Sequence, residues 1–205
     1  MNLKRVHLLS GLTITLFIGA HLFNHVFSIF GAEAHLDIME KLRVVYRNVL
    51  AEAILLAAVC VQIFSGLKLF FRKRKADLNF YKKMQIRTGL YLSFFLLIHV
   101  SAVGIGRYIL ELDTNFYFGA AGLNTFPLNL FFVPYYGLAI LSFFGHLAGI
   151  HHSKMRKKVL GLSIAGQANL ILITGMILTL IILYGMTNGF AGAEIPAAYN
   201  IMTEK

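Results

Sequence analysis

The sequence predicts an all-α integral membrane protein, a single domain built from five transmembrane helices. The chain has 205 residues, of which 58% are hydrophobic and 14% are charged, and its mean hydropathy is +0.70. Soluble domains of this size are less apolar. Five apolar runs follow one another, and each is long enough to cross about 30 Å of hydrocarbon as a helix. They leave little sequence for any other domain.

The predicted spans fill most of the domain 1–205. They cover approximately residues 8–30, 48–71, 88–109, 131–151 and 161–187. The first run is long enough to span and lacks a small-residue cleavage site, so we interpret it as a permanent helix rather than a signal peptide. Residues 116–126, rich in Gly, Ala and aromatic side chains, predict an ordered outer loop or a short interfacial stretch.

The net charge of +10 comes from basic residues in short segments beside the apolar runs. This pattern indicates membrane topology rather than nucleic-acid binding. By the positive-inside rule, these segments are cytoplasmic, so the N-terminus is expected inside and the C-terminus outside a cell (inner) membrane. The remaining connections have mixed or weakly acidic charge, and the tail carries Glu194 and Glu204. The basic residues are Lys4, Arg5, Arg72, Lys73, Arg74, Lys75, Lys82, Lys83, Arg87, Lys154, Arg156, Lys157 and Lys158.

The assigned directions give each polar residue in a span a height, because a helix rises about 1.5 Å per residue. His21 and His99 then lie roughly 20 Å and 16 Å from the inner surface. Gln62 and His146 form a second level about 8 Å from that surface. An imidazole in hydrocarbon is costly unless a partner or a metal uses it.

Two histidines at similar height on different helices match the requirement of a six-coordinate b-type haem, whose iron takes one imidazole on each face. His21 and His99 meet it, and His25, one turn higher, is the alternative to His21. Simple hydrogen bonding of each histidine to a neighbour is the other interpretation. The topology argues against a di-iron centre, because His21 and His25 lie in the outer half whereas His146, His151 and His152 lie toward the inner surface.

Three motifs carry a resemblance to a known family. Arg5-Val-His7 is followed by Gly11 and His21-Leu, Arg87-Thr-Gly89 precedes His99, and His146 precedes Gly149. Over nearly the whole chain, this pattern resembles the five-helix cytochrome b anchor of succinate dehydrogenases and quinol:fumarate reductases. The resemblance implies an outer haem b held by His21 and His99, cytoplasmic flavoprotein and iron–sulfur subunits, and electron transfer with a quinone such as menaquinone.

The second predicted helix departs from that family, because Gln62 stands where the family has a haem-binding histidine. The inner haem is then absent, or it is held by His146 alone. A third option is a hydrogen bond between Gln62 and His146 across an empty or quinone-occupied site. One haem is favoured over two.

Other polar residues are candidates for the surroundings of haem propionates or quinone. Glu52, near the outer end of its helix, is expected to pair with Arg47 or Arg43 or to relay a proton of a quinol. Residues at the inner surface could hold a propionate, a quinone or an acidic partner, or could anchor lipid headgroups. They are Arg5, His7, Arg87, His151 and His152. His35 gives no indication of a role, and the single cysteine, Cys60, is a packing residue.

The expected function is that of a haem-containing membrane anchor that is not catalytic alone. The alternatives are a cytochrome b subunit of another membrane oxidoreductase and a haem-free structural anchor that binds quinone or lipid.

Overall fold

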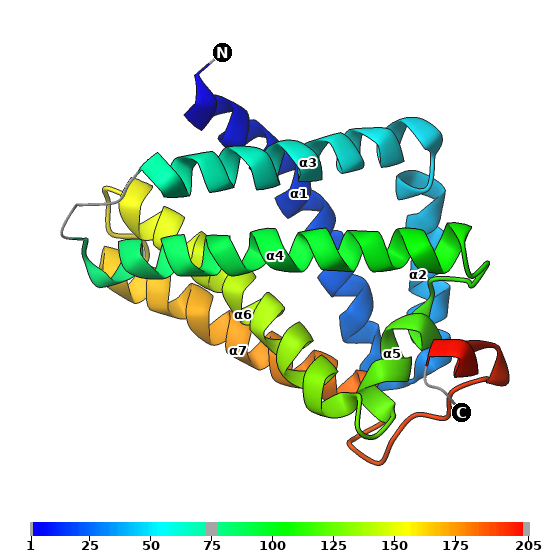
Figure 1. Cartoon of the computed structure of the whole chain (residues 1–205). Coiled ribbons are helices and arrows are strands. Elements are labelled where there is room, and N and C mark those ends of the chain that lie inside the picture. The colour runs from blue at the N-terminus through cyan, green and yellow to red at the C-terminus, as the bar shows by residue number, and fades with distance from the viewer. Residues whose placement is uncertain (1, 73–77, 203–205) are drawn as a thin grey trace.

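The computed structural model describes residues 2–72 and 78–202, and within these ranges the chain is helical and contains no β-strand. Figure 1 shows the arrangement of its helices. In chain order the elements are α1 (Leu3–Val26), the 3₁₀ helix η1 (Phe27–Phe30), α2 (Ala32–Tyr46), α3 (Val49–Arg72), α4 (Phe80–Tyr108), α5 (Phe116–Asn124), α6 (Asn129–Lys154), α7 (Ile164–Met186) and the 3₁₀ helix η2 (Ala197–Met202).

Five helices of the described chain are long and apolar enough to cross a membrane, which agrees with the predicted number of spans and is typical of a multi-pass membrane protein. α1 continues into η1 to complete the first of these segments, Leu3–Phe30. α4 begins at Phe80 rather than at 88, because the side chain of Asn79 accepts a hydrogen bond from the backbone N–H of Lys82 and caps the helix there. Hydropathy marks only the apolar part of a helix that extends beyond it.

Two connections between the predicted spans contain helices. Residues 32–46 form α2 and residues 116–124 form α5, which begins where the side chain of Asn115 accepts a hydrogen bond from the backbone N–H of Tyr117. α5 contacts both α2 and η2. These three elements gather at one end of the bundle (Figure 1), which we call the capped end.

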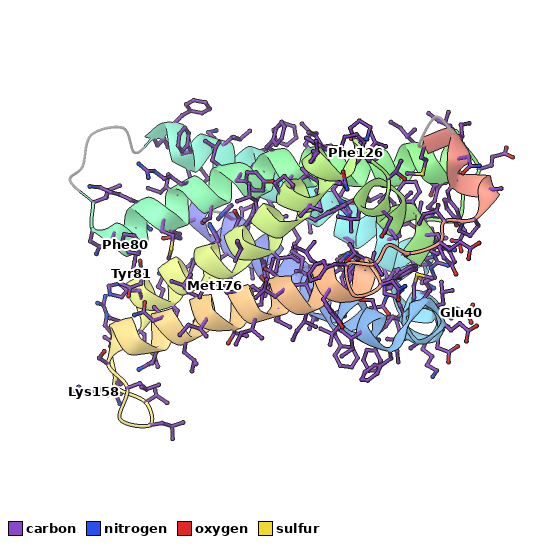
Figure 2. The ribbon with its side chains drawn as sticks, turned by 90° about the horizontal axis from the view of Figure 1, so that it is seen from below. Glu40, Phe80, Tyr81, Phe126, Lys158 and Met176 are labelled. Carbon is purple, nitrogen blue, oxygen red and sulfur yellow. The ribbon has the colours of Figure 1, made fainter. Side chains whose placement is uncertain are left out.

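The opposite end, the basic end, holds the end of α3, the start of α4, the end of α6 and the start of α7 (Figure 1). Figure 2 shows Phe80, Tyr81 and Lys158 at this end and Glu40 of α2 at the other. Basic segments therefore share one end, as the alternation of spans requires. Lys73, Arg74, Lys75 and Glu204, which also entered the topology prediction, lie outside the described residues.

The long helices form two packed units that close into a ring. α1 packs against α3, and α6 packs against both α4 and α7; contacts of α3 with α4 and of α1 with α7 join the two units. Small residues on α6 allow close approach. A Cβ on Gly149 would lie 2.6 Å from Cβ of Gln85 and 2.8 Å from the carbonyl oxygen of Tyr81, so α4 touches the α6 backbone there. The ring encloses the site described next.

Candidate functional site

A cavity of 320 Å³ lies inside the ring of helices, within the range of about 300–1,000 Å³ that is typical of ligand sites. All five long helices line it, together with α2 and α5. Aliphatic and aromatic side chains form most of its wall. Its polar side chains include His21, His25, Glu52, His99, Arg47, Arg107, Thr114, Asn115 and the hydroxyls of Tyr46 and Tyr136.

His21 of α1 and His99 of α4 line this cavity from different helices, with ring centroids 6.3 Å apart and ring planes at 64°. Each ring stacks on a phenylalanine one turn earlier in its own helix: Phe17 lies 5.7 Å from His21, and Phe95 lies 5.0 Å from His99. The two histidines that the sequence places at similar height therefore line the same cavity. Within the described chain, no hydrogen bond is recorded for either ring nitrogen of His99.

His25 belongs to a chain of imidazoles that leads from the cavity to α2. Its Nε2 lies 3.2 Å from Nε2 of His21, and its Nδ1 lies 3.3 Å from Nε2 of His35. The amide nitrogen of Asn24 lies 3.1 Å from the same nitrogen of His35. Among the described residues, Asn24 Oδ1 and His35 Nδ1 are buried without a hydrogen-bond partner. This cluster does not satisfy its own polar atoms.

Sequence reasoning missed His35, which is only 2% exposed. Burial, followed by the charges of His21 and Arg43, lowers the pKa of His35 to about 4, so its ring is neutral at pH 7. A signal was present: His35 and Met39 are four residues apart and share the buried face of α2. The low hydropathy of this segment concealed it.

The wall of the cavity toward the capped end carries charged side chains. Arg107 Nη1 donates to Glu52 Oε1 over 2.6 Å, and Arg47 Nη2 donates to Thr114 Oγ1 over 3.1 Å. The expected pairing of Glu52 with Arg47 or Arg43 is therefore wrong. The last turn of α4 lies beside the first turn of α3, so Arg107 pairs with Glu52. Arg43 and Arg47 instead pair with Asp113.

Asp113 anchors this charged group. Arg43 donates two hydrogen bonds to its carboxylate, of 2.7 Å and 3.2 Å, and Arg47 Nη2 lies 3.5 Å away. Burial alone would raise the pKa of Asp113, but the hydrogen bonds and charge of Arg43 and the charge of Arg47 outweigh it and hold the pKa below its usual range. The carboxylate therefore stays ionised and fixes the position of both guanidinium groups.

The second level of polar residues differs from the expectation. Gln62 accepts a hydrogen bond of 2.6 Å from Ser10 Oγ and lies 3.3 Å from His7 Nε2, while His146 Nδ1 donates to the backbone oxygen of Gln85 over 2.8 Å. The suggested hydrogen bond between Gln62 and His146 is therefore wrong. The amide of Gln62 is directed to α1, since α3 packs on α1, and His146 is directed to α4.

The remaining candidates lie near the basic end. Arg5 and Arg87 are exposed and do not line the cavity. His151 Nε2 lies 2.9 Å from Gln167 Oε1, and His152 stacks on Tyr81 with ring centroids 4.0 Å apart. The structure does not bring these four residues into one site.

The cavity contains side chains of the types that bind a haem. His21 and His99 supply imidazoles from two helices, with ring centroids 6.3 Å apart, so that both could hold one haem iron. Arg47 and Arg107 could face carboxylates from the charged wall. Within the described residues, no group of three or more His, Cys, Asp or Glu side chains could hold a bare metal ion. A cofactor that brings its own equatorial ligands would need only the two imidazoles from the protein.

No protein-family model, no curated protein and no solved structure matches the chain.

Proposed function

We propose that the chain is the haem b-containing anchor of a membrane oxidoreductase, and that it passes electrons between a quinone and a flavoprotein with its iron–sulfur subunit. One observation carries the haem assignment. His99 lines an apolar cavity, no hydrogen bond is recorded for its ring nitrogens among the described residues, and it faces His21 across 6.3 Å. An imidazole kept in such a place is poorly solvated unless a ligand uses it.

Different side chains of the cavity would bind different parts of the cofactor. His21 and His99 would hold the haem iron, and the stacked Phe17 and Phe95 orient their rings. His21 is a better ligand than His25, because His25 uses both ring nitrogens in contacts with other histidines, whereas among the described residues His21 makes such a contact through Nε2 alone. A bound haem would supply one-electron chemistry at this place.

The charged wall suits the propionates of a haem. Arg47 and Arg107 line the cavity, and each is held by another side chain of the wall, Thr114 for Arg47 and Glu52 for Arg107. Guanidinium groups fixed in this way bind carboxylates with little loss of side-chain entropy. In this proposal Glu52 positions Arg107, and a role in relaying a proton of a quinol at the same wall remains part of the proposal.

The family and the partner follow from the sequence resemblance to succinate dehydrogenase and quinol:fumarate reductase anchors. Support from the structure is the gathering of the basic segments at one end of the bundle. In this proposal the basic end is cytoplasmic and docks the soluble subunits, and the protein resides in the cell (inner) membrane. The quinone, for example menaquinone, reacts at a membrane face, and the chain is not catalytic alone.

The haem assignment is tested on the purified protein by a reduced-minus-oxidised absorption spectrum and a pyridine haemochrome assay. A b-type signal is expected. His99→Ala and His21→Ala should lose low-spin character, whereas His152→Ala, at the basic end, should keep the wild-type spectrum. A wild-type protein without haem would disprove the assignment, and a loss in His25→Ala but not in His21→Ala would transfer the ligand role to His25.

The orientation is tested by labelling single cysteines in whole cells with a membrane-impermeant maleimide. Asp37→Cys at the capped end and Lys157→Cys at the basic end are introduced into a Cys60→Ser background. The proposal expects Asp37→Cys to be labelled from outside and Lys157→Cys only after the cells are opened. The reverse pattern contradicts the proposed orientation.

A further inference from the structure

Four polar side chains join α1 to α3 between the cavity and the basic end. Ser10 Oγ lies 2.6 Å from Gln62 Oε1, Gln62 Nε2 lies 3.3 Å from His7 Nε2, and His7 Nδ1 lies 2.9 Å from Ser65 Oγ. We call Ser10, Gln62, His7 and Ser65 the clamp. All four lie in the helix pair whose packing forms the first unit of the bundle.

A single assignment of hydrogens satisfies every member of the clamp. Ser65 donates to the backbone oxygen of Val61 over 2.6 Å, so its hydroxyl oxygen accepts from His7 Nδ1–H. His7 Nε2 is then an acceptor and receives the amide N–H of Gln62. The amide oxygen of Gln62 in turn accepts from Ser10, whose hydroxyl lies closer to it, at 2.6 Å, than to the backbone oxygens of Val6 at 3.0 Å and His7 at 3.3 Å. A polar network that is complete in this way stabilises the packing of helices in an apolar medium and leaves no group for a further ligand.

Clamp side chains also cover glycines that could otherwise admit a flat ring. A Cβ on Gly11 would lie 3.2 Å from Nε2 of Gln62, and a Cβ on Gly66 would lie 3.3 Å from Cε1 of His7. On α4, a Cβ on Gly89 would lie 2.9 Å from Cε1 of His146. The side chains of Gln62, His7 and His146 thus occupy the space over these glycines.

This level is also separate from the cavity, because no member of the clamp lines it, nor does His146. His146 donates from Nδ1 to a backbone oxygen, which leaves Nε2 as an acceptor, the form in which an imidazole binds a metal. The position on α3 is Gln62, whose amide is already used, and the nearby imidazole of His7 has both ring nitrogens engaged by Ser65 and Gln62. The donors and the packing at this level do not fit a haem.

We infer that the clamp replaces a second haem, so that this chain carries a single haem at His21 and His99 and is closed to a cofactor at the level of Gln62 and His146. The inference rests on the proposed function, because it concerns the number of haems that the chain holds. The missing histidine at position 62 is not the only obstacle to a haem at this level, because the side chains of Gln62, His7 and His146 also fill the space over the glycines.

The first test counts haems per polypeptide in the purified full chain by pyridine haemochrome. The expected ratio is one, and a ratio of two overturns the inference. A ratio of zero contradicts the proposed function, and with it the count of one, whereas a ratio of two contradicts the inference alone. The two proposals therefore fail in different ways.

Variants locate the haem that is counted. His146→Gln should keep one haem with the wild-type reduced spectrum, whereas the matched variant His99→Gln should lose it. Gln62→His should also remain at one haem, because His7 and His146 still cover the glycines. A second haem in Gln62→His, or a changed spectrum in His146→Gln, overturns the inference.

A second measurement tests the hydrogen bonds of the clamp independently of haem content. Thermal unfolding in detergent is compared for Ser10→Ala, Gln62→Leu and the double variant. The clamp predicts that the fall in Tm of the double variant is clearly smaller than the sum of the single falls, because the two groups bond each other. The control pair, Thr13→Ala with Gln62→Leu, should be additive, since the Thr13 hydroxyl bonds the backbone of its own helix. Additivity in both pairs contradicts the clamp.

Discussion

The two levels of polar residues in the bundle differ in whether their polar atoms all have hydrogen-bond partners. At the level of His21 and His99, imidazoles line an apolar cavity, and atoms of the neighbouring Asn24 and His35 are buried without partners in the described chain. At the level of Gln62, every member of the clamp is hydrogen-bonded. Both levels place polar groups inside an apolar bundle. Only at the level of Gln62 do hydrogen bonds among these groups offset the cost of removing them from water.

In our proposals, this difference separates a ligand site from a group of residues that only packs the helices. A buried polar group without a partner costs about 1–3 kcal/mol, so a fold that keeps such groups beside a cavity must recover that free energy elsewhere, for instance from a ligand. A network that is complete stabilises the fold and closes the space around it. Position in a membrane span alone does not distinguish the two cases, since His99 and Gln62 are both placed within spans.

The largest effect is expected from filling the cavity. Ala139 is 6% exposed and lines it, so Ala139→Phe should reduce the haem content more than tenfold, because the added ring occupies the space of the ligand. Its neighbour Leu138 is 49% exposed, and Leu138→Phe should retain haem. Haem per polypeptide is measured by pyridine haemochrome; equal loss in both variants would show that the ring disturbs the helix rather than the cavity.

A smaller effect is expected from acid at the cavity level. The pKa of His35 is about 4 in the fold, against about 6.5 when unfolded, so the unfolded chain binds more protons between these values. Stability is then greatest above about pH 6.5 and falls as the pH drops toward 4, by about 2 kcal/mol at pH 5. Thermal unfolding of wild type and His35→Gln at pH 7.5 and pH 5 measures this contribution. The variant should lose less stability on acidification, and an equal loss would contradict the assignment.

At the packed level, an added methyl group should be harmful. Gly89→Ala places a Cβ 2.9 Å from Cε1 of His146, and the overpacking should cost about 1 kcal/mol after the usual gain from replacing a helical glycine. Gly19→Ala is the matched control, because nothing lies within 4 Å of its added Cβ. Tm values in detergent should fall for the first variant and stay equal or rise for the second. Equal shifts would mean that His146 moves freely away from Gly89.

The smallest effect is expected at the charged wall. Arg107 and Glu52 have side chains that are 25% exposed, so their ion pair should contribute at most about 1 kcal/mol. Arg107→Gln should lower Tm slightly because Glu52 is left without its partner, and adding Glu52→Gln should restore part of the loss. A double variant that is less stable than Arg107→Gln would show that Glu52 has another stabilising partner.

The sequence predicted the features that depend on distance along a helix axis. A rise of about 1.5 Å per residue places His21 and His99 at similar depth whatever the neighbours are, and the structure brings their rings together. Features that depend on the direction of a side chain around its helix were not predictable in this way. In the structure, Glu52 therefore forms an ion pair with Arg107 rather than with Arg47. Gln62 bonds Ser10 and His7 rather than His146.

Elements outside the apolar runs were also missed, because hydropathy does not detect a helix that lies beyond the spans. α2 and α5 are fixed by local capping and by contacts with the end of the bundle. His35 belongs to α2 and enters the imidazole chain only once that helix folds against α1. Amphipathic spacing inside a polar connection is the signal that would have indicated it.

The division of the bundle into two packed units has a consequence for assembly. His21 belongs to the pair α1–α3, and His99 belongs to the group α4–α6–α7. A cofactor bound to both histidines would act as a cross-link between the units, so that the free energy of its binding adds to that of their association. Binding of the cofactor would then be coupled to association of the two units. In a cell short of the cofactor, the two units would separate more easily.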